Sequence, residues 1–556
     1  MKDIDVADAV IIGAGASGAV VAKELAEAGL RVVLLERGPK LNPADFYLHD
    51  ELTSHMGSGL RTPPGSEEPF APREFRFQGE ENFRTLYPSD WEYSAQGAVV
   101  GGGMLFYGGL MWRRPPVDFR MKSEYGHVEG TTLEDWPITY EELEPDFTKA
   151  EYEMGVSGEA GVDPYEGKRS KPFPLPPVEL QPGDVMIQET AKRMGYRPFR
   201  TPLGIITREY RGRNPCIQHP CCNGFICEIG AKSTPVTALL PRALGTGNCK
   251  LVPGALVKQI TVDGRGNPNG VEYYRGKKLM HQRARLIVLA ASAIETPRLL
   301  LNSASRWFPK GMGNANGWVG RNLMGHISPW VWGVMDRTTN EGFGPGPGVA
   351  INDFCMKNPG FAGGGVIYSR TEVTPISFTG RRPRGAPRWG LEHKRYQREN
   401  FRRYIRLFAP AEDMPQFENR VEVSPTVRDA WGIPVPRITH SFHPNDYRVW
   451  EFFSRKMQEI LEEAGARDIT PSGLGRGGAG YQLGTCRMGN DPKTSVVNRW
   501  GRSHEIDNLF VVDGSVFVTS GGRNPALTIQ ALAYRFAGYI VREWKGGAWR
   551  KGSREV

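Results

Sequence analysis

The sequence predicts an α/β fold that begins with a parallel sheet, and the pattern of its first forty residues carries that prediction. An apolar run at 9–12 is typical of a buried parallel strand, and a helical pattern follows at 17–28. A second apolar run, at 31–35, comes directly after this helix. A strand, a helix and a further strand in close succession form the unit from which parallel sheets are built.

The turn between the first strand and the helix has the glycine spacing G-x-G-x-x-G. Gly13 permits a tight turn, Gly15 lets a phosphate approach the backbone, and Gly18 lets the helix pack closely on the strand. Ala16 and Ser17 lie at the helix start, where free N–H groups favour an anion. This arrangement predicts that the chain binds a dinucleotide.

An acidic residue at the end of the second strand supports the same prediction. Glu36 lies 18 residues beyond Gly18, and Arg37 follows it. A carboxylate at this position can accept hydrogen bonds from the adenosine ribose of a dinucleotide. Glu36 and Arg37 are therefore predicted to contact the cofactor.

Length and composition limit the classes of protein to which the chain can belong. With 556 residues the chain is too long for one simple core, so at least two domains are expected. The sequence has no run of 18 or more apolar residues, so no transmembrane helix is expected, and no signal peptide is recognised at the start of the chain. The net charge of +9 comes from scattered basic residues, which argues against a nucleic-acid-binding surface.

A glycine-rich stretch at 97–103 marks a second place where backbone could lie against a ligand. Gly101, Gly102 and Gly103 are consecutive and precede Met104. Three glycines after an apolar pair permit close approach of the backbone to a bound group. The alternative is a flexible loop with no contact to a ligand.

Five segments spread along the chain together resemble the glucose–methanol–choline (GMC) oxidoreductases. The resemblance is closest to the bacterial branch that contains gluconate 2-dehydrogenase, glucoside 3-dehydrogenase and the large subunit of FAD glucose dehydrogenase. The segments occur in the family's order and are the opening glycine motif, the glycine stretch up to Trp112-Arg113 and Asp118-Phe119, the strand and helix at 284–300, Val319 to His326, and Gly484 to Pro525.

The resemblance implies a Rossmann-like FAD-binding domain interleaved with an α+β substrate domain built on an antiparallel sheet. The implied FAD-binding domain consists of residues 1–120, 225–330 and 470–556. The implied substrate domain consists of residues 121–224 and 331–469. Apolar runs at 284–291 and 509–513 are predicted to be further strands of the nucleotide-binding sheet.

The resemblance also implies contacts between the C-terminal segment and FAD. Asp513 and Gly514 match the family's second FAD block, in which the aspartate binds near the ribityl chain and pyrophosphate. Asn524, Pro525 and Ala526 open a helical pattern, and the start of that helix would face the flavin.

The linkage between flavin and protein is a further point on which the resemblance bears. Some relatives carry FAD on a histidine of the glycine stretch, and the matching position here is Phe106. Phenylalanine cannot form that bond, so non-covalent FAD with Phe106 near the flavin is expected.

Four of the seven cysteines fall within twelve residues. Three thiolates on a tight loop can hold an iron–sulfur cluster, and relatives carry a three-iron [3Fe-4S] cluster before a similar Ile-Cys-x-Ile-Gly-Ala sequence. The candidate ligands are Cys216, Cys222 and Cys227, with Cys221 as the alternate. Reduced or disulfide-bonded thiols are the main alternative, and a zinc site is a further one.

The catalytic pair is the point at which the chain departs from its family. The family's usual histidine is replaced by Tyr481, whereas its partner 43 residues later is Asn524. A phenol with an ordinary pKa of about 10 is a poor base at neutral pH unless a nearby cation lowers that pKa. Three interpretations follow: Tyr481 is a tuned base or hydrogen-bond partner, His443 or His440 reaches the site, or ordinary alcohol oxidation has been lost.

These features together predict an FAD-dependent oxidoreductase that removes a hydride from a hydroxyl-bearing carbon of a sugar or similar alcohol. A dehydrogenase is favoured over an oxidase. The resemblance implies a cytochrome or quinone as electron acceptor and a small partner subunit that could co-export the chain. A cytoplasmic or a periplasmic location is therefore expected. A lyase-like or isomerase-like flavoprotein, or an FAD-binding subunit of a larger complex, is the alternative.

Overall fold

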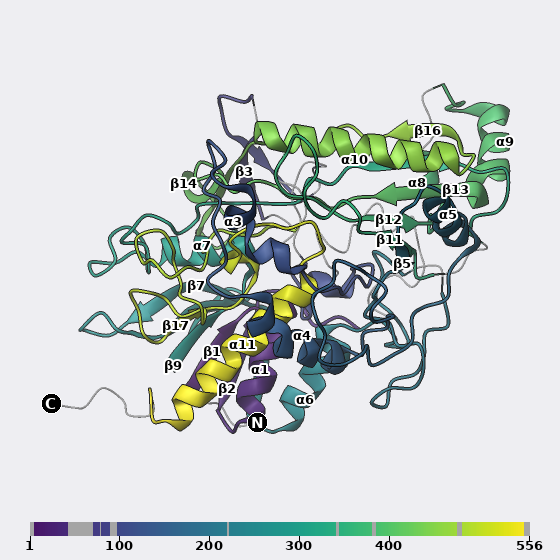
Figure 1. Cartoon of the computed structure of the whole chain (residues 1–556). Coiled ribbons are helices and arrows are strands. Elements are labelled where there is room, and N and C mark those ends of the chain that lie inside the picture. The colour runs from purple at the N-terminus through teal and green to yellow at the C-terminus, as the bar shows by residue number, and fades with distance from the viewer. Residues whose placement is uncertain are drawn as a thin grey trace.

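A mixed sheet of seven strands forms the core of the part of the chain that the structure describes (Figure 1). The strand order is β6-β2-β1-β9-β8-β7, and β17 lies beside β9. The structure is a computed structural model that describes residues 5–42, 71–77, 79–88, 90, 97–219, 222–340, 344–380, 385–474 and 481–549. The strands of this sheet are β1 (Val6–Ile12), β2 (Val32–Glu36), β6 (Cys249–Pro253), β7 (Ala255–Val262), β8 (Pro268–Arg275), β9 (Lys278–Leu289) and β17 (Leu509–Val511).

Four parallel strands of this sheet end at the same edge. β1 pairs with β2 and with β9, and β9 pairs with β17. In this register Ile12 lies opposite Leu35 and Leu289, and Leu289 lies opposite Val511. The loops that follow these strands therefore meet, and this edge is where ligands of parallel sheets bind.

Helices from both ends of the chain pack beside the large sheet. The helix α1 (Ala16–Glu27) packs against α11 (Ala526–Lys545), and α11 packs against α4 (Tyr140–Met154) (Figure 1). Val20, Val21 and Leu25 of α1 are completely buried. The predicted parallel strands and both helices are confirmed, although β1 and β9 begin earlier than their apolar runs.

A second sheet contains six antiparallel strands in the order β16-β10-β13-β12-β11-β5 within the described residues. The long helix α10 (Pro444–Glu463) packs on β10 and β16, and α5 (Pro182–Arg193) packs on β11 (Figure 1). This confirms the predicted antiparallel sheet. Its strands are β5 (Pro198–Arg200), β10 (Trp330–Val334), β11 (Pro347–Ile351), β12 (Ile367–Arg370), β13 (Tyr404–Phe408) and β16 (Arg467–Pro471).

A third sheet, of four strands in the order β14-β15-β3-β4, connects segments that are far apart in the sequence. Its strands are β3 (Arg73–Phe77), β4 (Arg84–Leu86), β14 (Arg420–Arg428) and β15 (Pro434–His440). β3 belongs to the expected FAD-binding domain and β15 to the expected substrate domain, yet the two strands pair in one sheet. The limits of the two domains therefore stay a prediction.

Shorter helices complete the described fold. They are α3 (Met121–Tyr125), α6 (Leu240–Gly245), α7 (Ser292–Asn302), α8 (Pro375–Gly380) and α9 (Gly390–Asn400). Across the described ranges, no helix combines the length and the apolar character needed to span a bilayer.

Candidate active site

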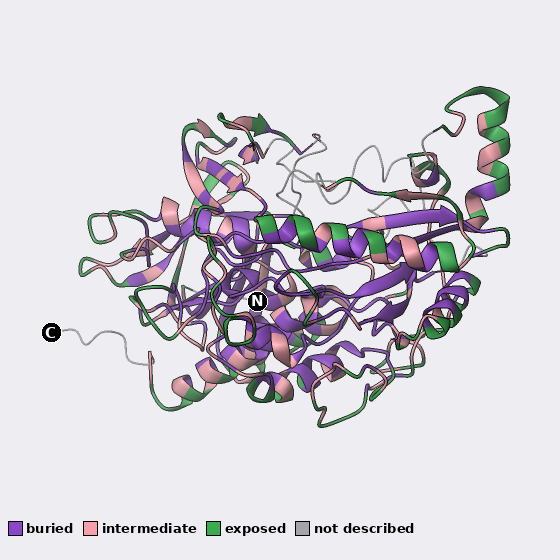
Figure 2. Ribbon diagram, turned by 45° about the horizontal axis from the view of Figure 1, so that its top comes forward, coloured by how far each residue is buried: buried purple, intermediate pink, exposed green. Residues whose placement is uncertain are grey.

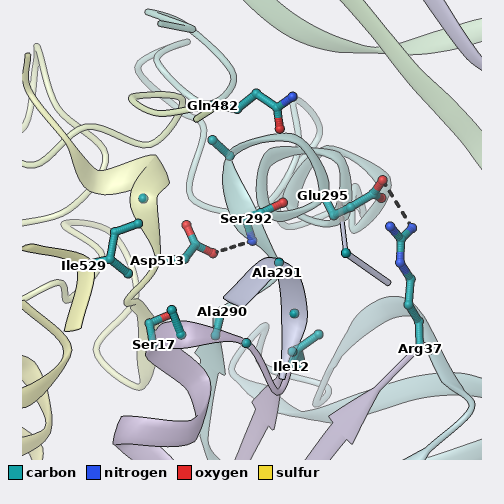
Figure 3. A pocket seen from close by; sticks show the side chains of 18 of the residues that line it. Ile12, Ser17, Arg37, Ala290, Ala291, Ser292, Glu295, Gln482, Asp513 and Ile529 are labelled. Carbon is teal, nitrogen blue, oxygen red and sulfur yellow. Dashed lines mark hydrogen bonds and ion pairs between the residues drawn. The ribbon is translucent and has the colours of Figure 1, made fainter. Parts of the chain in front are cut away.

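The loops at the carboxyl edge of the large sheet enclose a cavity of about 410 Å³. Gly13 after β1, Glu36 at the end of β2, Ala290 after β9 and Asp513 after β17 all line it. Figure 3 shows residues that line this cavity, with the Asp513 carboxylate hydrogen-bonded to the backbone of Ser292. The register of the parallel strands therefore builds the site from four separate segments.

Three glycines shape the first wall of the cavity. Gly13 has a φ of +103°, and a Cβ there would lie 2.3 Å from the Ala290 oxygen. A Cβ at Gly18 would lie 1.9 Å from the Gly13 oxygen, so these two glycines have the predicted turn and packing roles. A Cβ at Gly15 would meet nothing nearer than the Cα of Gly102, at 4.0 Å. Gly15 lines the cavity, so a side chain there would enter space that the protein leaves open.

The Glu36 carboxylate is fixed by backbone N–H groups. Its Oε2 accepts the N–H of Ala14 and its Oε1 accepts the N–H of Gly38, each at 2.9 Å. Burial raises the pKa of Glu36, and these two bonds lower it. The carboxylate is therefore held in one orientation at the wall of the cavity.

A cluster of three arginines and Glu295 borders the cavity near Glu36. Glu295 lies 3.4 Å from Arg37, 2.9 Å from Arg73 and 3.0 Å from Arg298 (Figure 3 shows the contact with Arg37). Burial raises the pKa of Glu295, but the three guanidinium groups lower it well below its usual value. Glu295 is therefore ionised, and it orients Arg37 beside the cavity.

Asp513 joins the second wall to the C-terminal segment. Its Oδ2 accepts the N–H of Ser292 at 2.9 Å and the hydroxyl of Thr296 at 2.6 Å, and its Oδ1 accepts the N–H of Ser515 at 2.9 Å (Figure 3). Burial raises the pKa of this carboxyl, and these hydrogen bonds lower it. Ser292 has a φ of +81°, and its buried hydroxyl has no hydrogen-bond partner among the described residues.

The predicted glycine stretch lines part of the cavity, and one of its residues holds the first glycine turn in place. Gly102, Gly103 and Met104 line the cavity, and a Cβ at Gly103 would meet nothing within 4 Å. Gly101 is not among the lining residues; its N–H donates to the oxygen of Ala14 at 3.0 Å. The prediction that Gly101 contacts the cofactor is therefore corrected to a role in holding the turn, as for Gly18.

Phe106 does not lie where the sequence places it. Its side chain is 2% exposed and is not among the residues that line the cavity. The neighbouring Tyr107 lines the cavity instead, and its hydroxyl donates to the oxygen of Ser233 at 2.6 Å. Phe106 packs in a small apolar cluster with Leu41, Val99, Leu105 and Phe225.

Tyr481 and Asn524 lie together at the cavity wall, as their spacing predicts. The Asn524 Nδ2 donates to the Tyr481 hydroxyl at 2.7 Å, and both residues line the cavity. Partial removal from water raises the pKa of the phenol, although Arg370 and Asn524 act in the opposite direction and the residue is still 40% exposed. Tyr481 is therefore a protonated hydrogen-bond donor at neutral pH, and the interpretation as a tuned base is not supported. The Asn524 Oδ1 is buried without a partner in the described part of the chain.

His326 lies behind Tyr481, with the two ring centroids 5.1 Å apart. Its Nε2 contacts the oxygen of Ser520 at 3.2 Å, and a carbonyl can only accept, so Nε2 carries the proton. Burial lowers the pKa of His326 to about 4. The ring is thus neutral at pH 7, and its buried Nδ1 has no partner among the residues described.

Neither of the two predicted histidines, His443 and His440, lines the cavity. His443 begins α10, where its Nδ1 accepts the N–H of Asn445 at 3.1 Å and its Nε2 contacts the oxygen of Glu129 at 2.9 Å. His440 is buried against Asp413, 3.0 Å away. The catalytic prediction for His443 is therefore corrected, because the helix cap occupies its Nδ1 and the Glu129 oxygen occupies its Nε2.

The cysteine loop forms a separate small cavity lined by Cys216, Cys222 and Cys227. Burial raises the pKa of the Cys216 thiol, and it raises that of Cys222 to about 11. Among the residues the structure describes, no group of three or more His, Cys, Asp or Glu is placed to hold a metal ion. The predicted iron–sulfur cluster is thus not supported, and Cys221 lies outside the described residues.

Lys232 fills the polar interior of this loop instead. Its Nζ donates to the backbone oxygens of Tyr107, Cys222 and Phe225 at 2.7–3.2 Å. Because Tyr107 lines the large cavity, this lysine ties the cysteine loop to the wall of the candidate active site.

Sequence reasoning missed several lining residues, although a signal for some of them was present. Ser292 and Glu295 follow the strand at 284–291, and the rule that places ligands after parallel strands applies to them as well. Tyr107, Gln482 and Ile529 line the cavity without such a signal.

Comparison with known proteins identifies the family. Models of the GMC oxidoreductases match residues 7–328 and 415–533. The chain belongs to the GMC oxidoreductase family. This GMC oxidoreductase is 33% identical to 2-methyl-1,2-propanediol dehydrogenase of Mycolicibacterium austroafricanum, over 97% of this chain and 96% of that protein. It is 30% identical to the gluconate 2-dehydrogenase flavoprotein of Pantoea cypripedii, over 96% of this chain and 93% of that protein.

A solved structure agrees with the fold. Pyridoxine 4-oxidase from Mesorbium loti superposes with a TM-score of 0.62 at 20% identity, over 96% of this chain and 99% of that one. The predicted family, fold and enzyme class, an FAD-dependent oxidoreductase, are confirmed at this level.

The cavity fits the FAD that GMC oxidoreductases bind. The open space at Gly15 and the unpartnered hydroxyl of Ser292 are features that a bound cofactor would fill and satisfy. The Glu36 carboxylate lies at the wall where it could accept hydrogen bonds from the ribose hydroxyls of the cofactor. The predicted residues that line this space are Gly13, Gly15, Ala16, Ser17, Glu36, Arg37, Gly102, Gly103, Met104, Asp513, Gly514, Asn524, Pro525 and Ala526.

Proposed function

We propose that this GMC oxidoreductase oxidises a hydroxyl group of a sugar, glycoside or similar alcohol and passes the electrons to an external acceptor. One observation carries the proposal: Glu36, at the dinucleotide end, and the Tyr481–Asn524 pair line the same cavity. The two relatives are named for gluconate and 2-methyl-1,2-propanediol, which are both hydroxyl compounds.

The chain's own residues would bind and orient the alcohol. When bound, FAD supplies the electron sink, with flavin N5 as the proposed hydride acceptor. The Tyr481 hydroxyl accepts from Asn524, which leaves its proton available for the substrate oxygen. The unpartnered Oδ1 of Asn524 can accept the hydroxyl hydrogen of the same substrate. The pair would thus hold one oxygen by a donor and an acceptor.

His326 would set the orientation of Tyr481. Its neutral ring contacts the phenol ring, and its Nε2 is fixed by the Ser520 oxygen. The ring is neutral at pH 7, because burial lowers its pKa to about 4, so His326 would position the phenol without adding a charge beside it.

Non-covalent FAD and an external acceptor belong to the same proposal. The residue at the family's linkage position, Phe106, cannot form a bond to flavin and packs away from the cavity. A cytochrome or quinone acceptor and a small partner subunit, with cytoplasmic or periplasmic location, follow from the resemblance alone. No electron-transfer step is assigned to the cysteine loop.

An anaerobic titration tests the proposal. Purified flavoprotein is mixed without oxygen with sugars, sugar acids, glycosides and small diols, and the flavin absorbance is followed. We expect at least one of these compounds to bleach the flavin, and stoichiometric product carbonyl to form. Full flavin occupancy with no bleaching by any member of the panel, and bleaching by dithionite, would contradict alcohol oxidation.

The protonated Tyr481 favours one alternative function. A site without a base of ordinary strength suits a flavoprotein that does not oxidise alcohols, such as a lyase or isomerase, or an FAD-binding subunit of a larger complex. The same titration separates these cases, because they leave the flavin oxidised in the presence of every alcohol.

A further inference from the structure

The segment between β12 and β13, residues 371–403, stands out from the antiparallel sheet, and we call it the arm. It contains α8 and α9, and α9 lies at the upper right of Figures 1 and 2. Its base is packed: Phe378 stacks on Tyr396 with ring centroids 6.1 Å apart and contacts Phe401 and Tyr404 edge-on. The arm is therefore a structured projection.

The tip of the arm exposes large apolar side chains. Trp389 is 86% exposed and Leu391 is 62% exposed. The turn that carries Trp389 is held by His393, whose Nδ1 contacts the oxygen of Pro387 at 3.0 Å. Large apolar side chains that are exposed together on a fixed turn are typical of a surface that contacts a membrane or another protein.

Basic residues outnumber acidic ones in the arm. The residues that the structure describes between 371 and 403 include six Lys or Arg and three Asp or Glu. Along α9 only Asn400 is buried, His393, Tyr396 and Gln397 are partly buried, and the remaining positions are exposed (Figure 2). Arg388, Lys394 and Arg398 are exposed and form no ion pair within the described residues.

We propose that the arm binds an anionic lipid bilayer, with Trp389 and Leu391 in the interfacial layer and the basic side chains against the headgroups. An interfacial element combines an exposed Trp or Leu with Lys or Arg, because the ring and the aliphatic chain enter the headgroup layer while the cations bind acidic lipids. This inference is independent of the substrate and of the chemistry at Tyr481.

The shape of the arm favours a bilayer over a protein partner. A stable protein interface buries roughly 800 Å² on each side, with a flat apolar centre. The arm instead presents two apolar side chains at the end of a narrow, highly charged helix, and Glu392 of that helix pairs with Arg395. The headgroup layer of a bilayer is deformable, so such a tip can insert into it without a complementary pocket.

Co-sedimentation of the FAD-loaded enzyme with vesicles tests the proposal. One set of vesicles contains phosphatidylcholine alone, and the other contains phosphatidylcholine mixed with phosphatidylglycerol. We expect binding to the second set only, weakened by salt. Trp389→Ala should lower the partition coefficient about tenfold, by the loss of one buried aromatic side chain. The triple change Arg388→Gln, Lys394→Gln and Arg398→Gln should lower it roughly a hundredfold, at about fivefold per charge.

A matched control uses another exposed tryptophan. Trp307, 45% exposed on a different part of the surface, is changed to Ala and should leave vesicle binding unaltered. Three outcomes overturn the proposal: no binding to acidic vesicles, equal binding by the wild type and both arm variants, or a Trp389-dependent dimer on size exclusion in place of lipid binding. Flavin content of every variant is measured, so that loss of binding is not confused with misfolding.

Discussion

Gly15→Val should give a folded protein that cannot hold FAD. Gly15 lines the cavity, and its Cβ position is 4.0 Å from the nearest other backbone atom, the Cα of Gly102. Its φ is not in the left-handed region, so a valine side chain causes no backbone strain and points into open space. The substitution therefore removes the room for the cofactor and leaves the fold intact.

The size of the effect follows from the volume that is lost. Three added carbon atoms occupy the space that the pyrophosphate needs, and we expect FAD affinity to fall at least a hundredfold, which is about 2.7 kcal/mol. Added FAD stabilises the wild-type protein in proportion to the logarithm of its concentration over its dissociation constant. The variant should show no such rise in Tm.

The assay compares three variants in parallel. Gly18→Ala should destabilise the fold itself, because its Cβ would overlap the Gly13 oxygen at 1.9 Å. Gly29→Ala, which has nothing within 4 Å but a φ of +89°, should cost only about 1–2 kcal/mol and keep its flavin. Flavin content, circular dichroism and Tm with and without FAD are measured. A Gly15→Val protein with full flavin occupancy would refute the placement of the cofactor.

Three further predictions concern other parts of the site. Asp513→Ala should lower the stability of the fold by about 3–5 kcal/mol and should also lower the flavin content. The reason is that it leaves the buried donors of Ser292, Thr296 and Ser515 unpaired. Thermal melts and flavin absorbance check this, and Asp491→Ala, at an exposed position, is the control. The lowered pKa of His326 contributes stability that is complete above pH 6.5 and is lost as the pH falls to about 4, an amount of about 3 kcal/mol; urea unfolding across that range should show a weaker pH dependence in His326→Gln, and equal slopes would contradict it. Acid precipitation should release all of the flavin into the supernatant, since Phe106 offers no covalent linkage, and flavin that stays in the pellet would show the opposite.

The nucleotide-binding edge could be predicted from sequence because its signals are local. Gly13 and Gly18 are fixed by contacts with their own turn and with Ala290, and the apolar runs of parallel strands are continuous. The spacing of Tyr481 and Asn524 was also informative, because both positions belong to segments that hold the family's motifs. The antiparallel sheet, by contrast, was predicted only through the resemblance.

The errors have a common cause in contacts between residues distant in the chain. Phe106 and Tyr107 are adjacent and both aromatic, but Phe106 packs in an apolar cluster with Leu41, Val99, Leu105 and Phe225, and Tyr107 lines the cavity. His443 has the sequence context of a site residue, yet Asn445 and Glu129 occupy its nitrogens. Four clustered cysteines predict a metal site, but the spacing of thiols in the sequence does not determine whether they converge.

The rate of flavin reduction in site variants tests the central claim most directly. The alcohol that bleaches the wild-type flavin is mixed anaerobically with Asn524→Ala and with His443→Ala, and the single-turnover rate per bound flavin is measured. Asn524→Ala should slow reduction by about a hundredfold or more, because it removes the amide that holds both the phenol and the substrate oxygen. His443→Ala should reduce at the wild-type rate, although the lost helix cap costs about 1 kcal/mol of stability. Full-rate reduction in Asn524→Ala, or abolished reduction in a folded, flavin-loaded His443→Ala, would contradict the account.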